Sequence, residues 1–132
     1  MRTRFVMVLM LLAALACRID ISTSYIKEAH ITRDPEGTER IGRGYAYGSE
    51  DTFHAVIELA QAKGPEEIRI VWSVKEAAGL EPGTVLGEET VEIENGVILF
   101  HLAPEHEWAL GKYQFDIYLN GDHEKTVEFR VR

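Results

Sequence analysis

Five histidines are the residues of this chain with the clearest capacity for chemistry. His101 and His106 lie on either side of Ala103-Pro104, and Glu105 and Glu107 flank His106 with carboxylates. Zinc is held by three or four convergent N, O or S ligands, so His101 and His106 are the candidate ligands of a metal site. Their spacing matches no known metal-binding pattern. We therefore expect a solvated acidic loop, with no metal and no cofactor.

The other histidines suggest less chemistry. His123 lies between Asp122 and Glu124 in an expected hairpin loop, where acidic neighbours favour the protonated imidazole. A pH-sensitive contact at His123 follows as a hypothesis, because an unperturbed imidazole titrates near neutral pH. His30 and His54 are interpreted as isolated surface positions.

No arrangement of residues predicts catalysis. The chain has four serines, Ser22, Ser24, Ser49 and Ser73. None of them lies in a nucleophile-elbow motif or in a Ser/His/Asp order that suggests a triad. Adjacent acids (Glu66-Glu67 and Glu88-Glu89) are typical of a solvated face, and a small domain offers no obvious cleft for a pair of catalytic carboxyls. We predict no catalytic residue and no enzymatic activity.

Residues 42–48 form an unusual segment in which Arg43, Tyr45 and Tyr47 alternate with small residues, three glycines and Ala46. A phosphate-binding glycine loop needs a strand before it and a helix after it, and both are missing. Arginine and tyrosine are enriched at binding hot spots, so Arg43, Tyr45 and Tyr47 are the candidate partner-binding residues. The alternative is a crossover between two sheets whose tyrosines cover the edge of the core.

The N-terminus predicts where the protein works. Arg2 and Arg4 precede an apolar run over residues 5–16, which ends in Ala14-Leu15-Ala16-Cys17. A basic start, a short apolar middle and small residues at a cleavage point define a secretory signal peptide, here residues 1–16. The run is too short to span a bilayer, which takes about 20 apolar residues.

Cys17 is the only cysteine, and a single thiol is unusual in an exported protein. The segment resembles the lipobox of bacterial lipoproteins, with Ala14 and Leu15 in the reverse of the usual order. That resemblance implies lipid attachment (including palmitate) at Cys17, residues 17–24 as a short tether, and a protein anchored to a membrane of the cell envelope. Arg18, in place of an acidic residue, favours the outer membrane of a two-membrane host. The alternative is a secreted or periplasmic protein with a free thiol.

Size and charge limit the classes of partner. Removing residues 1–16 leaves 116 of the 132 residues, enough for one domain with one core. The removed segment contains two arginines and no acidic residue, so the formal net charge of −8 becomes −10. An acidic surface repels phosphate backbones, and no basic stripe compensates. We therefore expect no nucleic-acid partner.

From Tyr25 the chain reads as short runs of β-branched and aromatic residues separated by turn residues. The expected strands are 25–33, 52–60, 67–75, 84–93, 97–103, 112–119 and 124–131. Residues 51–62 also fit a helical face, but the alternation of Phe53, Ala55, Ile57 and Leu59 favours a strand. Seven short strands predict one all-β domain over 25–132, an antiparallel β-sandwich.

Two Asn-Gly pairs predict turns. Asn95-Gly96 predicts a two-residue hairpin that pairs Ile93 with Ile98 and Val91 with Phe100, because both central residues of a type I′ turn need positive φ. At Asn120-Gly121 a two-residue turn would put the apolar sets of the two strands on opposite faces. Phe115 faces Val127 only with a bulge or a three-residue loop, and we predict the three-residue loop.

Trp72 and the run Trp108-Ala109-Leu110-Gly111-Lys112-Tyr113 resemble the core tryptophan and the penultimate strand of immunoglobulin-like domains in bacterial envelope lipoproteins. The resemblance implies an immunoglobulin-like fold, with Tyr113 near the tyrosine-corner position and Gly111 allowing a tight start to the strand. It implies no function. The sequence thus predicts a membrane-tethered binding or structural module outside the cytoplasm, whose partner is another envelope protein. The alternatives are an inhibitor of an envelope protease or hydrolase acting through sandwich loops, and a metal- or ligand-binding lipoprotein using residues 101–107.

Overall fold

A computed structural model describes residues 24–42 and 45–132. The predicted signal peptide (1–16), Cys17, nearly all of the tether (17–24) and Arg43 lie outside these residues, so their predictions stay predictions. Within the described part of the chain, no helix is long and apolar enough to cross a membrane.

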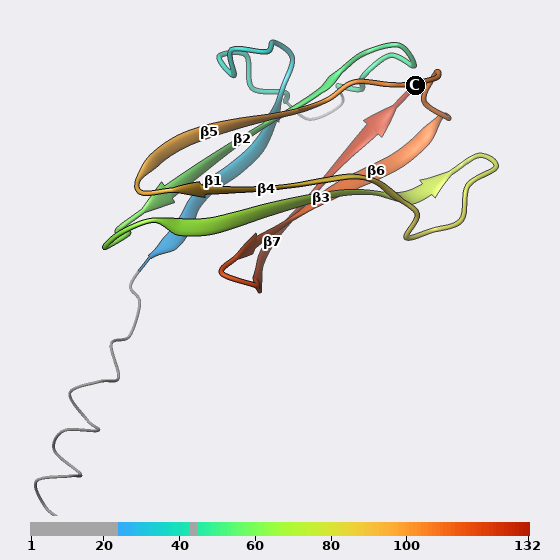
Figure 1. Cartoon of the computed structure of the whole chain (residues 1–132). Helices are drawn as coiled ribbons and strands as arrows, with labels where there is room; N and C mark the ends of the chain where they lie inside the picture. The colour runs from blue at the N-terminus through green and yellow to red at the C-terminus, as the bar shows by residue number, and fades with distance from the viewer. Residues whose placement is uncertain (1–23, 43–44) are drawn as a thin grey trace, which may run out of the picture.

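Seven strands form two packed layers (Figure 1). The three-stranded sheet has the order β1-β2-β5, and the four-stranded sheet has the order β4-β3-β6-β7, with every neighbouring pair antiparallel. The expected all-β sandwich is confirmed, and the strands match the predicted ones within two residues at each end. Their bounds are β1 Tyr25–Thr32, β2 Phe53–Ala60, β3 Glu66–Ala77, β4 Val85–Ile93, β5 Gly96–Leu102, β6 Gly111–Leu119 and β7 Asp122–Val131.

Alternation along the strands builds the core between the sheets. In β2 the side chains of Phe53, Ala55, Ile57 and Leu59 are at most 2 % exposed, which confirms a strand rather than a helix over this segment. From the other sheet, β3 contributes a matching buried row. Side chains that point away from this core form the two outer faces of the sandwich, because successive residues of a strand point to opposite faces.

The predicted hairpin at Asn95-Gly96 is wrong. β4 pairs with β3 and β5 pairs with β2, so the connection passes from one sheet to the other. The amide of Asn95 holds the backbone of Ala62 (2.8 Å from its Oδ1 to the Ala62 nitrogen), and only Gly96 of the pair has positive φ. The four apolar side chains do share the core, but from opposite layers: Val91, Ile93, Ile98 and Phe100.

At the second Asn-Gly pair the predicted three-residue loop is wrong and the bulge is found. Leu119 pairs with Asp122, so the loop is Asn120-Gly121, with φ of 50° and 88° as a type I′ turn requires. A bulge in the register between Ile117 and Tyr118 then restores the predicted pair of Phe115 with Val127. One extra residue in β7 puts both apolar rows on the same face.

Tyr113 and Gly111 have the predicted structural roles. The Tyr113 hydroxyl donates a hydrogen bond to the carbonyl of Ala109, at 2.5 Å, which is the geometry of a tyrosine corner. Gly111 has φ of 151°, and a Cβ there would lie 2.2 Å from the backbone oxygen of Glu76. Only glycine fits this start of β6. The predicted core residue Trp72 is 2 % exposed and packs against Phe53 and Phe115.

Candidate functional site

The outer face of the four-stranded sheet carries a series of polar side chains in mutual contact. Arg69 on β3 points outward, because its neighbours Ile68 and Ile70 are fully buried. Its guanidinium group lies 2.9 Å from the Glu88 carboxylate on β4 and 4.1 Å from the ring centre of Tyr118 on β6. One arginine thus links three strands, with its charge paired on one side and stacked on an aromatic ring on the other.

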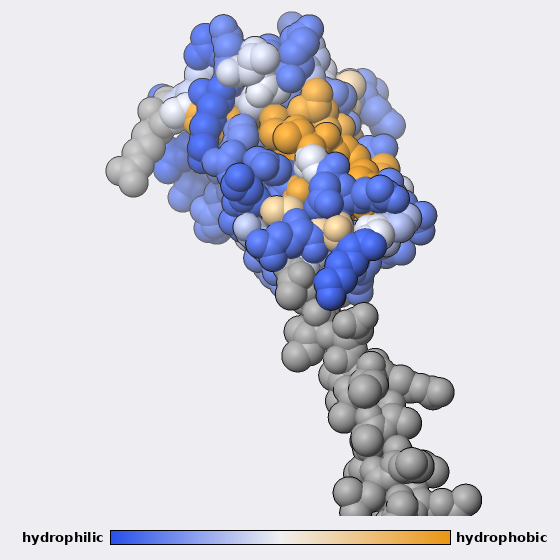
Figure 2. All heavy atoms as spheres, turned by 90° about the vertical axis from the view of Figure 1, so that its left-hand side faces the viewer, coloured by the Kyte–Doolittle hydropathy of each residue, from blue (hydrophilic) through white to orange (hydrophobic). Residues whose placement is uncertain are grey.

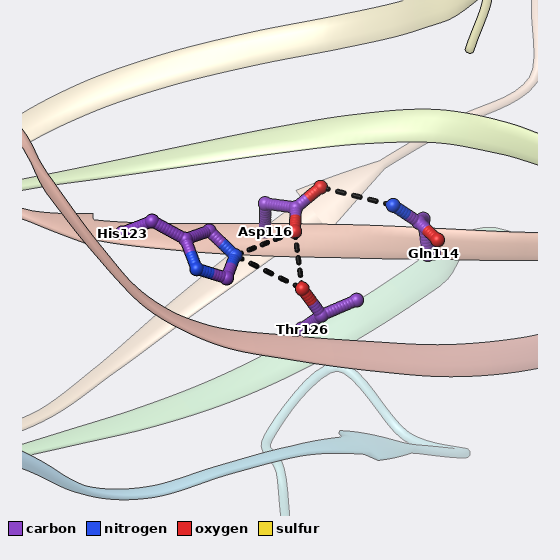
Figure 3. A network of polar contacts seen from close by, with 4 residues as sticks. All are labelled: Gln114, Asp116, His123 and Thr126. Atoms are coloured by element: carbon purple, nitrogen blue, oxygen red, sulfur yellow. Dashed lines mark hydrogen bonds and ion pairs between the residues drawn. The ribbon is translucent and has the colours of Figure 1, made fainter.

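The series continues onto β7 through His123, whose ring lies edge-on to Tyr118 with 5.3 Å between ring centres. His123 Nε2 lies 2.8 Å from Asp116 Oδ1 and 2.9 Å from Thr126 Oγ1 (Figure 3). The Thr126 hydroxyl also donates to Asp116, and Gln114 donates to the other carboxylate oxygen at 3.1 Å. The name polar row is used below for Glu88, Arg69, Tyr118, His123, Asp116, Thr126 and Gln114.

The carboxylate of Asp116 is the most constrained group of the polar row. Partial burial raises the pKa of Asp116, but hydrogen bonds from Thr126, His123 and Gln114 outweigh that effect and hold the pKa below its usual range. Asp116 is therefore ionised at neutral pH. The sequence predicted that Asp122 and Glu124 would be the acidic neighbours of His123, whereas the structure provides Asp116 from the adjacent strand.

The polar row does not have the geometry of a catalytic triad. In a triad one imidazole nitrogen faces the nucleophile and the other faces the carboxylate. Here the same nitrogen of His123, Nε2, faces both the Thr126 hydroxyl and the Asp116 carboxylate. The Thr126 hydroxyl also donates a hydrogen bond directly to that carboxylate. The arrangement orders side chains on an open sheet face, which suits binding.

The outer face of the three-stranded sheet carries a pair of histidines. His54 on β2 and His101 on β5 are opposite each other in register, and their Nδ1 atoms lie 2.7 Å apart. The interpretation of His54 as an isolated position is therefore wrong. Burial and the proximity of His101 lower the pKa of His54, with partial opposition from the carboxylates of Asp34, Glu36 and Asp51.

A loop over residues 33–39 covers part of this second face. Gly37 comes so close that a Cβ there would lie 2.8 Å from the methyl groups of Leu99 and Val56. The Asp34 carboxylate accepts hydrogen bonds from the backbone amides of Thr38 and Glu39, at 3.0 and 2.7 Å, which fixes the loop. Beyond the loop this face exposes two apolar side chains, Leu99 to 37 % and Val97 to 60 %, with Glu58 opposite Val97. Figure 2 faces the end where β4 passes into β5 and shows hydrophobic side chains gathered in one patch among polar ones.

The structure separates the predicted metal ligands. His101 contacts His54, whereas His106 lines a different hollow, of about 340 Å³, with Leu80, Leu102 and Trp108. Among the described residues no group of three or more His, Cys, Asp or Glu side chains is arranged to hold a metal ion.

The candidate partner-binding residues have different surroundings. Tyr47 is 2 % exposed, and its hydroxyl donates a 2.7 Å hydrogen bond to the Thr32 carbonyl, so its ring cannot contact a partner. The alternative prediction is correct in part: Tyr47 covers the edge of the core, but its segment joins β1 and β2 of the same sheet and reaches the other sheet only where Tyr47 pairs with Val131 of β7. Tyr45 is half-buried beneath the Arg33 guanidinium, 4.4 Å from its ring centre, and lines a hollow of about 510 Å³ between β1 and β7. Contact of Tyr45 with a partner stays a prediction.

Comparison with known proteins supports the fold and no particular activity. No protein-family model matches the sequence, and no curated protein matches it significantly. The structure is similar to an immunoglobulin-like protein from Pseudomonas aeruginosa, with a TM-score of 0.56 at 10% identity over 86% of this chain and 100% of the other. It is also similar to a β-glucosidase involved in saponin metabolism from intestinal bacteria, with a TM-score of 0.58 at 15% identity over 85% of this chain. A β-glucosidase from Listeria innocua gives 0.54 at 12% identity over 83%.

These similarities define an immunoglobulin-like β-sandwich. The chain spans only 16% of the length of either β-glucosidase, so it matches one part of each enzyme. It matches the whole of the immunoglobulin-like protein. At such low identity the likeness concerns the fold alone, and functions differ widely among proteins that share a sandwich.

Proposed function

We propose that this protein is an exported, lipid-tethered binding module without catalytic activity, and that the polar row is its contact surface for another envelope protein. The observation that carries the proposal is the unbroken series of contacts from Glu88 on β4 to Thr126 on β7. It crosses all four strands of one sheet and lies on the open outer face.

The polar row suits binding because its side chains are already ordered. Association is opposed by the loss of side-chain freedom, about 0.5–1.5 kcal/mol for each flexible side chain that becomes fixed. Arg69 is held by Glu88 and Tyr118, and His123 is held by Asp116, before any partner arrives. Tyrosine and arginine are also the residue types most enriched at interface hot spots.

The nature of these side chains favours a protein partner over a sugar or a nucleic acid. Sugar binding by stacking needs an open aromatic face, and the Arg69 guanidinium already covers one face of the Tyr118 ring. The row contains two carboxylates and one arginine, on a chain with 22 acidic residues against 14 basic ones, which disfavours a polyanion. Alternating charges on a flat face suit a complementary protein surface.

Tethering at Cys17 belongs to the same proposal. Each buried methylene of an acyl chain contributes about 0.8 kcal/mol, so two or more chains hold a protein at a membrane almost permanently. A small domain with no enzymatic site gains effective concentration from being held near its partner. Mass spectrometry of the mature N-terminus tests this part: a diacylglyceryl group on Cys17 supports it, and an unmodified Cys17 overturns it.

A matched pair of arginine substitutions tests the contact surface. Arg69→Ala removes the centre of the polar row, whereas Arg40→Ala removes an arginine that pairs with Glu28, 3.5 Å away, on the other sheet. The tagged full-length proteins are purified from the native envelope, and the recovered partner is quantified. We expect R69A to recover at least tenfold less partner than the parent protein does, which corresponds to about 1.4 kcal/mol of binding free energy. R40A should recover as much partner as the parent. Equal recovery with both variants, at unchanged melting temperature, overturns the proposal.

A further inference from the structure

The two histidines on the outer face of the three-stranded sheet meet nitrogen to nitrogen. The Nδ1 atoms of His54 and His101 are 2.7 Å apart, and their ring centres are 4.9 Å apart. This separation of the rings is close to the largest that so short a contact between the two nitrogens allows, so the Nδ1 atoms point almost straight at each other. Such a contact is a hydrogen bond only when one nitrogen carries a proton and the other offers its lone pair.

The number of protons on the pair therefore decides whether the contact exists. Two neutral rings make it when the donor ring has its proton on Nδ1 and the acceptor ring has its proton on Nε2. One further proton can bind the free Nε2 of the donor ring, which becomes an imidazolium and donates a stronger, charge-assisted bond. The next proton must go to the acceptor Nδ1, where it faces the donor N–H across 2.7 Å and forces the rings apart.

The surroundings of the two rings indicate which one is the donor. His101 is exposed on the edge strand β5, whereas His54 is half-buried on the central strand β2. Water stabilises a charge better on the exposed ring, so His101 suits the donor that becomes an imidazolium first. Burial and the proximity of His101 lower the pKa of His54, as expected of the ring that is protonated last.

The backbone and the neighbouring loop hold His54 more firmly than His101. Thr32 lies opposite His54 on β1 and is fully buried. The Thr32 hydroxyl donates a 2.9 Å hydrogen bond to the carbonyl of Asp34, where the loop over residues 33–39 begins. His101 has no strand on its other side, because β5 is the edge of the sheet. When the rings separate, His101 is therefore the side chain that turns into solvent.

Carboxylates on two segments stabilise the protonated form of His54. Asp34 and Glu36 belong to the loop, Asp51 immediately precedes β2, and together with His101 they are the charged or titratable groups that act on His54. The three carboxylates raise the pKa of His54, against the larger lowering by burial and by His101. Once His101 has turned away, these carboxylates still face the His54 imidazolium. The separated state is therefore a defined arrangement and not a general loosening of the sheet.

We propose that His54 and His101 form a pH-operated switch: the rings stay in contact while one proton lies between them, and protonation of both rings releases His101 into solvent. Relative to the neutral pair, the switch adds two positive charges to this face, next to the exposed side chain of Leu99. It lies on the opposite face from the polar row and does not depend on the function proposed for that row.

The test detects the shared proton directly in the full-length chain. With ¹⁵N-labelled histidine, nuclear magnetic resonance measures the scalar coupling between the two Nδ1 atoms across the hydrogen bond while the pH is lowered from 8 to 4.5. We expect the coupling at neutral pH, its persistence after the first proton is taken up, and its loss with the second. The two uptakes should be at least about one pH unit apart, because the sites are coupled. His106, which lines a different hollow, should titrate in one step.

A matched pair of substitutions tests the influence of His101 on His54. In His101→Ala the acceptor nitrogen of His54 has no donor in front of it, so His54 should be protonated at roughly tenfold lower proton concentration, about one pH unit higher than in the parent. In the control His106→Ala, His54 should titrate as in the parent, and thermal melting shows that each variant is folded. The absence of the coupling at neutral pH overturns the proposal, as does its survival when both rings are protonated, or an unchanged titration of His54 in H101A. Partner recovery with R69A tests the polar row alone, so the two proposals fail separately.

Discussion

The two outer faces of this sandwich arise from the same alternation of side chains, but their exposed polar groups are paired differently. In the polar row each of these groups has a complementary partner, as Arg69 pairs with Glu88 and His123 hydrogen-bonds to Asp116. On the three-stranded sheet two identical imidazoles, His54 and His101, share one contact beside an apolar strip. The polar groups of the first face already have partners within the row, so we expect a partner protein to recognise this face as a whole.

Two glycines give the sharpest contrast between the sheets. We expect Gly111→Ala to cost at least ~3 kcal/mol, because a Cβ there would lie 2.2 Å from one backbone atom and 2.6 Å from another, at φ of 151°. Gly37→Ala should cost about 1 kcal/mol, since its Cβ would meet only the side-chain ends of Leu99 and Val56, at φ of 77°. Urea unfolding of both variants measures the difference. Similar costs would show that the loop over the three-stranded sheet is as rigid as the start of β6.

The Tyr47 hydroxyl contacts the backbone of the three-stranded sheet. Its removal should therefore lower the free energy of unfolding more than removal of the Tyr45 hydroxyl. The Tyr47 hydroxyl donates to the Thr32 carbonyl at 2.7 Å and lies 3.3 Å from the backbone nitrogen of His54. Tyr47→Phe leaves a buried carbonyl without its partner, and we expect a loss of about 1–3 kcal/mol in the free energy of unfolding. Tyr45→Phe is the control and should stay within about 0.5 kcal/mol. If the two variants unfold at the same urea concentration, the buried hydrogen bond contributes nothing.

The contrast between local and distant pairing also explains what the sequence could predict. Alternation of Ile68, Ile70 and Trp72 identified β3 and its buried face correctly, because a strand's two faces are encoded within the strand. Asn95-Gly96 failed as a hairpin signal because the partners of β4 and β5 lie in different sheets, which no local pattern reveals. The β6–β7 connection was half predicted: the apolar pattern required Phe115 opposite Val127, but a bulge achieves this as well as a longer loop.

The candidate sites were harder to predict for the same reason. His54 and His101 are 47 positions apart and meet only through the register of β2 and β5. Asp116 and His123 are close in sequence, and outward alternation on adjacent strands was a usable signal for their contact. Tyr47 belongs to a residue type enriched at surface hot spots, yet the segment between β1 and β2 pairs with Val131 of β7 at this point, which buries the Tyr47 ring against Phe53 and Phe129.

The two faces should also respond to different pH ranges. Burial lowers the pKa of His30 and of His54, and both lie on the three-stranded sheet. A histidine whose pKa is lower when folded stabilises the protein above its unfolded pKa of about 6.5, and this contribution is lost as pH falls from there through the lower pKa of the folded state. The lowered pKa of Asp116 instead contributes stability above about pH 4, which is lost only below that value. The first loss of stability on acidification is therefore expected from the three-stranded sheet.

Melting temperatures at pH 7.5 and 5.5 test this order. His54→Asn should reduce the fall in melting temperature between the two values, because one group that must take up a proton is gone. His106→Asn serves as the control and should leave the fall unchanged over this interval. An unchanged fall in His54→Asn would contradict the assignment of this pH range to the three-stranded sheet.

The smallest expected difference concerns two similar arginine–tyrosine contacts. Arg69 lies 4.1 Å from the Tyr118 ring centre and is also bound by Glu88, whereas Arg33 lies 4.4 Å from the ring of Tyr45. An arginine already held by a carboxylate loses less freedom when it stacks, so we expect a coupling of about 0.5–1 kcal/mol for Arg69 with Tyr118 and less than about 0.5 kcal/mol for Arg33 with Tyr45. Double-mutant cycles with alanine, followed by urea unfolding, measure both couplings. Adding Glu88→Gln to the first cycle should bring its coupling down to that of the second. If the coupling persists without the Glu88 charge, the polar row is a set of independent pairs and not one ordered surface.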